Sequence, residues 1–300
     1  MARTLYLTLL LPAAGALALL VDPASAARLP AFRSPLASGA SIAEEVRASA
    51  SAGSAEALFA RALELGESLE GSLTADRRRA LRSQLDHLLE GIGRRPGAAG
   101  LPWGAWIEAC RQAHREVAPG LMRAAALALG PDVVPLADSF NRRESPVALR
   151  VAALQALWRV DEMAGFNACG AALREAPRLD LHDRIVGEVL GACQGRFAEE
   201  LLLEAASHRS PVSERAKRLA VESLGERGSV PAIGLLGQVL GSERGNVLLR
   251  KAAGEALLQI GTDEALRAIA AVPPIDEAIE PVFHAYLGQL RQRIGLPARD

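Results

Sequence analysis

The sequence predicts an all-α protein in which pairs of helices repeat and stack on one another as a solenoid. Four Ala/Leu-rich segments end at Leu157, Leu190, Leu224 and Leu257, at spacings of 33, 34 and 33 residues. A fixed period of this size is typical of a solenoid, because each unit buries its apolar face only against its neighbours. No run alternates apolar and polar residues with β-branched enrichment, so no strand is predicted.

The composition agrees with close helix packing and argues against one class of partner. Hydrophobic residues make up 50% of the chain but aromatic residues only 4%, which suits Ala/Leu packing better than a large aromatic-walled ligand pocket. Lys and Arg number 34 against 35 Asp and Glu. A nucleic-acid partner is therefore not expected, because such binding needs an excess of cations to neutralise phosphates.

Residues 1–26 have the pattern of a secretory signal peptide. Arg3 precedes an apolar stretch from Leu5 to Val21, and Ala24-Ser25-Ala26 forms a small-residue cleavage site. The alternative is a retained membrane anchor, but the apolar stretch of about 17 residues is at the lower limit for crossing a bilayer. We expect cleavage after Ala26, a periplasmic or secreted protein, and no stable membrane span afterwards.

The next two segments differ in character. Residues 27–41 are rich in Pro, Ser, Gly and Ala, which predicts a flexible linker. Residues 42–118 show helical periodicity without the 33-residue period, which predicts a helical N-terminal capping region. Ser54 and Thr74 are the expected N-caps there. The expected helices run from Ser54 to Leu69, Thr74 to Ile92 and Trp103 to Val117, and Pro119-Gly120 precede a further helix from Leu121 to Leu129.

The repeats assign residues 119–300 to a solenoid and resemble a known family. In the clearest unit, Val230-Pro231-Ala232-Ile233 opens a first helix, Leu249-Arg250-Lys251-Ala252-Ala253 lies in a second, and Ile260-Gly261 closes it. This order resembles the HEAT-like repeats of the PBS-lyase type. The resemblance implies a right-handed α-α superhelix, here with an irregular N-terminal cap. Taken with the signal-peptide pattern of residues 1–26, it indicates an exported bacterial member of the family.

Several single residues have expected structural roles. Gly225, Gly228 and Gly261 lie where a helix must stop and reverse, which favours a residue that is free to adopt positive φ. By resemblance, Arg150, Lys217 and Arg250 occupy the family's basic position, where the side chain bonds to neighbouring turns. Cys193 is expected to be a small core residue. Cys169 and Cys193 are predicted not to form a disulfide, because the helical rise misaligns them.

Searches for catalytic chemistry find nothing recognisable. The phosphate-binding, nucleophile-elbow and zinc-protease motifs are all absent, and His87, His114, His182, His208 and His284 lack metal-ligand spacing. Some HEAT-like proteins are iron hydroxylases with paired His-Glu motifs, but no histidine here is followed by Glu. We expect no catalytic residue, cofactor or metal, and hence no enzyme. The alternative is a lyase-like or other enzyme subunit whose site is unrecognised.

The second helix of each repeat carries the candidate partner-binding residues. Positions six and two before the anchoring leucine share a helical face. They place one basic and one acidic stripe across three repeats, formed by Arg184 and Glu188, Arg218 and Glu222, and Lys251 and Glu255; the first repeat has Val151 and Gln155. By resemblance this face is concave. The stripes either orient a polar segment of a partner or form a solvated face whose charges pair within each helix.

Trp103 and Trp106 are the second candidate site, three residues apart on one helical face. One interpretation is an exposed anchor for a partner, since Trp is enriched at interaction hot spots. The other is that both side chains cover the apolar end of the solenoid. The function predicted from these features is a non-catalytic protein–protein interaction scaffold of the bacterial cell envelope that binds a protein or peptide. The partner's identity and the oligomeric state do not follow from the sequence.

Overall fold

The computed structural model describes residues 54–175, 179–242 and 246–272, with separate helical positions between 281 and 292. All regular elements in these ranges are helices, which confirms the all-α prediction. The predicted signal peptide, the linker and the start of the capping region lie outside the described residues.

The helices form a series of pairs. In chain order they are α3 (Ala55–Glu70), α4 (Ala75–Gly93), η1 (Ala98–Gly100), α5 (Trp103–Ala113), α6 (Val117–Leu129), η2 (Gly130–Val133), α7 (Val134–Phe140), α8 (Val147–Val160), α9 (Glu162–Arg174), α10 (Leu179–Arg184), η3 (Ile185–Leu190), α11 (Arg196–Ala206), α12 (Glu214–Glu226), η4 (Val230–Ala232), α13 (Ile233–Leu240), α14 (Val247–Ile260) and α15 (Asp263–Ala270).

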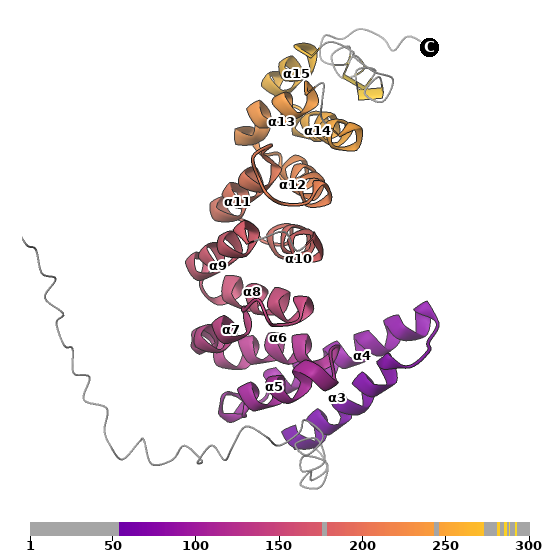
Figure 1. Ribbon diagram of the computed structural model, residues 1–300, viewed down its shortest axis with the longest axis vertical. Coiled ribbons are helices and arrows are strands. Elements are labelled where there is room, and N and C mark those ends of the chain that lie inside the picture. The colour runs from indigo at the N-terminus through magenta and orange to yellow at the C-terminus, as the bar shows by residue number, and fades with distance from the viewer. Residues whose placement is uncertain are drawn as a thin grey trace, which may run out of the picture. The chain divides into compact units, whose positions relative to one another are not determined.

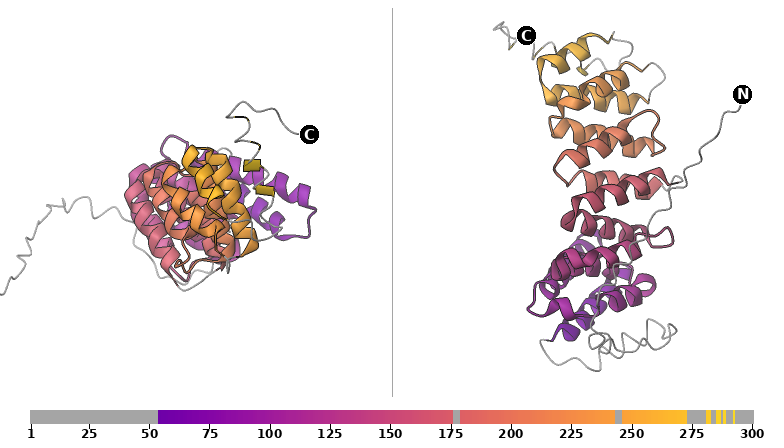
Figure 2. Two further views of the ribbon diagram at one scale, coloured as in Figure 1. Left: turned by 90° about the horizontal axis from the view of Figure 1, so that it is seen from above. Right: turned by 90° about the vertical axis from the view of Figure 1, so that its left-hand side faces the viewer.

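The helices between α4 and α15 pack in two layers (Figures 1 and 2). We call α4, α6, α8, α10 with η3, α12 and α14 layer A, in which each helix contacts the next. Layer B comprises α5, α7, α9, α11, α13 and α15, each of which packs on one or more neighbours in layer A or B. Each layer A helix from α6 onward therefore presents one face to layer B and the opposite face away from it.

Local chemistry explains where the helices begin. Ser54 accepts a hydrogen bond from the Ala57 amide at 3.1 Å, and Thr74 accepts one from the Arg77 amide at 3.3 Å, which confirms both predicted N-caps. These bonds satisfy amides that lack a partner within the helix. Pro119 and Gly120 lie in the first turn of α6 rather than before it, so the boundary predicted there was wrong. The proline is tolerated at this position because a first-turn N–H has no acceptor to lose.

The three glycines expected at turns have two different roles. Gly228 and Gly261 adopt φ of 64° and 63°, as expected for glycines that end a helix in the left-handed region. Gly225 instead lies inside α12, where a Cβ would approach the Cα of Ala256 in α14 to 2.7 Å. Its turn role was predicted wrongly: Gly225 is needed for the close contact between two layer A helices.

Arg150 and Arg250, two of the three basic residues expected to bond to neighbouring turns, do bond to other elements. Arg150 is fully buried, and its guanidinium donates to both carboxylate oxygens of Glu175 at 3.0 and 2.7 Å. Arg250 donates from Nε to the Leu240 carbonyl at 3.1 Å. Lys217 differs from the expectation, because its ammonium pairs with Glu214 in its own helix at 2.9 Å.

The apolar interior consists of two clusters that meet at α8. Leu149, Ala153 and Leu157 belong to the cluster with α3 to α7, whereas Leu154 and Trp158 belong to the cluster that continues to α15. The two faces of a single helix thus join the N-terminal helices to the helices that follow α8.

One segment has the length and apolar composition of a membrane span. Val117–Phe140 reaches a mean hydropathy of 1.3, the only such candidate among the described residues. It is not one straight helix, because Gly130 and Pro131 separate α6 from α7. Half of it is buried within the protein, and Leu121 and Met122 are fully buried, so in this fold it supplies core side chains.

Candidate functional site

The predicted charged stripes lie on three consecutive helices of layer A. Arg184 Nε is 2.7 Å from Glu188 Oε1, Arg218 Nε is 3.4 Å from Glu222 Oε1, and Lys251 Nζ is 3.7 Å from Glu255 Oε1. The hydrogen bonds that Arg184 donates to the Glu188 carboxylate are the main reason why the pKa of Arg184 is raised. All six side chains are partly exposed and accessible from solvent. Their charges pair within each helix, an arrangement that stabilises a helix by only a few tenths of a kcal/mol per pair.

The first repeat departs from the stripe pattern. Val151 is buried against the later core cluster, so it is not part of the exposed face. Gln155 remains partly exposed, and its side-chain amide donates to the backbone carbonyl of Glu188 at 3.2 Å. The acceptor lies in η3, a π-helical segment in which the Gly191 amide bonds to the Val186 carbonyl at 2.8 Å. Gln155 therefore connects α8 to the beginning of the stripes.

The tryptophan pair is not an exposed anchor. Trp103 and Trp106 are only 2% and 3% exposed. The Trp106 ring stacks on Phe59 with centroids 4.3 Å apart, and Trp103 packs edge-on against Trp106 at 5.6 Å. Trp103 Nε1 also donates to the Ala98 carbonyl at 2.9 Å. The structure supports the alternative of core side chains in the N-terminal region, and the hot-spot interpretation is corrected.

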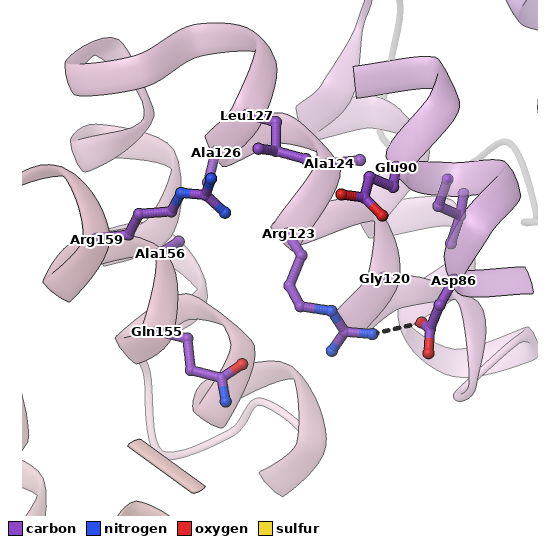
Figure 3. A pocket seen from close by; sticks show the side chains of 11 residues that line it. Asp86, Glu90, Gly120, Arg123, Ala124, Ala126, Leu127, Gln155, Ala156 and Arg159 are labelled. Carbon is purple, nitrogen blue, oxygen red and sulfur yellow. Dashed lines mark hydrogen bonds and ion pairs between the residues drawn. The ribbon is translucent and has the colours of Figure 1, made fainter. Parts of the chain in front are cut away.

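A cleft opens on layer A immediately before the stripes (Figure 3). Its volume is about 340 Å³. Helix α4 supplies one wall, α8 supplies the other, and α6 lies between them. The lining residues are Asp86, Leu89 and Glu90 from α4, Gly120, Arg123, Ala124, Ala126 and Leu127 from α6, and Gln155, Ala156 and Arg159 from α8.

Small residues of α6 create this cleft. A Cβ at Gly120 would collide with the side chain of Leu89, and a Cβ at Gly93 of α4 would come within 2.5 Å of the Ala124 carbonyl oxygen. Glycine at these two positions lets α4 and α6 approach closely. Ala124 then adds little bulk to the face of α6, so the space between α4 and α8 stays open.

The charged groups in the cleft are unequally paired. Arg123 donates to Asp86 at 2.7 Å, and Glu90 accepts from Arg94 at 2.5 Å. Arg159 is exposed and has no hydrogen-bond or ion-pair partner among the residues that the structure describes. Figure 3 shows its guanidinium extending toward the side of α6 that carries Ala126 and Leu127, across the cleft from Glu90. The cleft therefore offers one uncompensated cation.

The sequence contained only part of the signal for this cleft. Gly120 and Ala124 are four residues apart in an apolar segment, a spacing that places two small residues on one helical face. The walls come from residues thirty or more positions before and after them. Only the packing of α4 and α8 on α6 brings Asp86, Arg123 and Arg159 to one place.

The cysteines are poor candidates for nucleophiles. All three are free thiols; Cys110 and Cys169 are buried and Cys193 is half-buried. Burial raises the pKa of Cys110 to about 12 and that of Cys193 to about 11, so neither forms much thiolate at neutral pH. Within the described ranges, no three His, Cys, Asp or Glu side chains gather closely enough to hold a metal ion.

Comparisons with known proteins find structural similarity but no sequence match. No protein-family model and no curated protein sequence matches the chain. Among solved structures, the chain is similar to human deoxyhypusine hydroxylase in complex with glycerol, at 15% identity and a TM-score of 0.37. That match covers 79% of this chain and 98% of the hydroxylase.

The comparison corrects the expectation that the chain is not an enzyme. The matched solved structure is that of an enzyme, and the lack of a recognised motif does not by itself exclude catalysis. At this low identity and TM-score, the match gives this chain neither an activity nor a substrate.

Proposed function

We propose that this chain is an interaction scaffold of the bacterial cell envelope that binds a protein or peptide on the exposed face of layer A. In this proposal the helix pairs form a right-handed HEAT-like superhelix, and layer A lines its concave side. The anchoring leucines support the repeat, since Leu157, Leu190, Leu224 and Leu257 are all buried at equivalent places in successive layer A helices.

One observation carries the binding proposal. The exposed face of layer A keeps the same charge pattern over α10 with η3, α12 and α14, with a basic residue and an acidic residue four positions apart in each. Surface ion pairs of this kind contribute little to stability. A basic stripe beside an acidic stripe is, however, suited to orienting a partner, because electrostatic complementarity determines orientation and association rate more than it determines affinity.

The test swaps charges without removing any ion pair. Arg184→Glu with Glu188→Arg, combined with Arg218→Glu and Glu222→Arg, keeps the net charge and the attraction within each helix. The basic and acidic stripes that a partner would contact on α10, η3 and α12 exchange places. The mature protein and this variant should be used to capture partners from the native envelope fraction. We expect the variant to lose the partner while helicity and melting temperature stay unchanged.

A matched control comes from layer B. Arg174 of α9 and Glu204 of α11 form an exposed ion pair at 2.8 Å. Swapping these two residues makes a similar change on the other side of the fold and should leave capture unchanged. Equal capture by the wild type and the layer A variant would show that the partner does not use the stripes.

A further inference from the structure

We infer that the cleft between α4, α6 and α8 binds an acidic side chain of the partner together with an adjacent aliphatic side chain. In this arrangement the carboxylate pairs with Arg159, and the aliphatic group packs against the apolar lining of α4 and α6. The inference rests on the proposed function, because it names the chemistry of the segment that the layer A face would hold.

The cleft contains a cation, Arg159, that the acids lining the cleft do not neutralise. Asp86 and Glu90 are already bonded to Arg123 and Arg94, so neither acid neutralises Arg159. Arg159 lies in the last turn of α8, where a cation is favoured by the helix dipole. The dipole explains a basic residue at this position, but among the residues that the structure describes the guanidinium donors of Arg159 have no acceptor. A planar guanidinium is well matched to a carboxylate, which it can bind through two parallel hydrogen bonds.

Apolar surface lies beside Arg159 in the same cleft. The side chains of Leu89 and Leu127 and the methyl groups of Ala124, Ala126 and Ala156 line the same cleft. Leu127 is only half-buried, so part of an aliphatic side chain remains in contact with solvent. An aliphatic group of a partner would remove that surface from water, which is favourable in proportion to the area covered.

The cleft is small, and it adjoins the helices that carry the charged stripes. A volume of about 340 Å³ is at the lower end of the range for ligand pockets, which suits one or two side chains of a longer segment. Gln155 lines the cleft and also donates to the backbone carbonyl of Glu188, a residue of the stripes. A segment anchored in the cleft can therefore continue directly over α10 and η3 to the charged face.

The test uses purified mature protein and short peptides blocked at both ends. The probe is acetyl-Ser-Leu-Glu-Ser-amide, and the comparison peptides replace Glu by Gln or by Lys, or Leu by Gly. Because each peptide is amidated, the only carboxylate belongs to the acidic side chain. Binding is followed by NMR titration of leucine methyl groups, in which Leu89 and Leu127 report on the cleft. We expect saturable shifts at these two residues, strongest for the Leu-Glu peptide and weaker for all three comparison peptides.

The decisive variant is Arg159→Gln, which removes the charge from an exposed position. It should lower the affinity for the Leu-Glu peptide by at least about tenfold, as expected for loss of a charge-assisted hydrogen bond. The affinity for the Leu-Gln peptide should hardly change. Arg159→Lys should restore part of the affinity, since it restores the charge without the planar fork. The control is Arg196→Gln, an exposed arginine at the start of α11 in layer B, which should behave as the wild type.

Two results would overturn the inference. One is equal binding of the Leu-Glu and Leu-Gln peptides to the wild type, and the other is unchanged affinity of Arg159→Gln for the Leu-Glu peptide. These measurements involve no captured partner, so they stand apart from the test of the scaffold. If the stripe swap abolishes capture while peptide affinity does not depend on Arg159, the scaffold proposal remains and the cleft assignment fails.

Discussion

Helices α3 to α7 bury different kinds of side chain from residues 145–272, which we call the repeat region after the period of its sequence. From α3 to α7, the buried side chains that the structure describes are apolar, and they include the stacked rings of Phe59 and Trp106. From residue 145 onward, the interior also contains polar and charged side chains, namely Ser145, Arg150, His182, Ser229 and Arg250. The two regions use the same helix-pair construction but are held together by different interactions.

The buried polar groups connect elements that adjoin one another in the repeat region. Arg150 of α8 bonds to Glu175 after α9, and Ser229 before η4 donates to Glu199 of α11 at 2.5 Å. Such bonds have defined directions, whereas Ala/Leu surfaces can shift relative to one another with little loss of packing energy. This difference suggests that the polar groups fix the register between repeats, while large rings of defined shape do so in the N-terminal region.

The largest effect is expected from leaving Arg150 buried without its carboxylate. Arg150 is 0% exposed, and both of its Nη atoms bond to Glu175. Glu175→Ala should lower the free energy of unfolding by about 3–5 kcal/mol, because an uncompensated buried charge is costly. Denaturant unfolding measures this change.

The matched control is the exposed pair of Arg174 and Glu204, whose side chains are 60% and 43% exposed. Glu204→Ala should lower the free energy of unfolding by no more than about 1 kcal/mol. Similar losses for the two variants would mean that Arg150 finds other compensation, and the contrast between buried and surface charges would not hold.

A core truncation in each region tests whether the two apolar clusters act separately. Leu224 of α12 is 0% exposed and Leu63 of α3 is 1% exposed, and they belong to different clusters. Changing either residue to Ala should lower the free energy of unfolding by about 2–5 kcal/mol. If contacts act mainly between neighbours, hydrogen exchange should rise around α11 to α14 for Leu224→Ala and around α3 to α6 for Leu63→Ala. Exchange that rises equally along the whole chain in both variants would indicate one cooperative core.

The sequence predicted the features that depend on local periodicity. The four anchoring leucines are buried because a constant spacing returns the same helical face to the same place in each repeat. The N-caps Ser54 and Thr74 were predictable because their hydrogen bonds reach only three residues along the chain. The all-α class followed from the same local signals.

Features that depend on distant partners were not predictable. The burial of Trp106 requires Phe59, which lies on another helix. Gly225 is constrained by Ala256 in the next layer A helix rather than by its own turn. The cleft requires three helices whose side chains meet only after packing. Single-sequence periodicity identifies which face of a helix is apolar but does not identify what covers it.

The smallest effect concerns His182, which is fully buried in the repeat region. Neither ring nitrogen makes a hydrogen bond of good geometry. Burial lowers the pKa of His182 from its ordinary value of 6.5, because a charged imidazolium loses its hydration there. Arg150 acts in the same direction, whereas the Ala172 carbonyl and the carboxylates of Asp183 and Glu175 oppose it.

The sign of the pH dependence follows from this direction. Below about pH 6.5 the unfolded chain binds a proton at this histidine more readily than the folded chain does, so acid favours unfolding. The contribution of His182 to stability is complete above its unfolded pKa and is lost as the pH falls toward the lower folded pKa. The slope for one proton is at most about 1.4 kcal/mol per pH unit. Unfolding free energies of the wild type, His182→Leu and the exposed-surface control His208→Gln should be compared between pH 7.5 and pH 5. His182→Leu should lose less stability on acidification than either of the others; parallel curves for all three proteins would show that other groups cause the acid sensitivity of the repeat region.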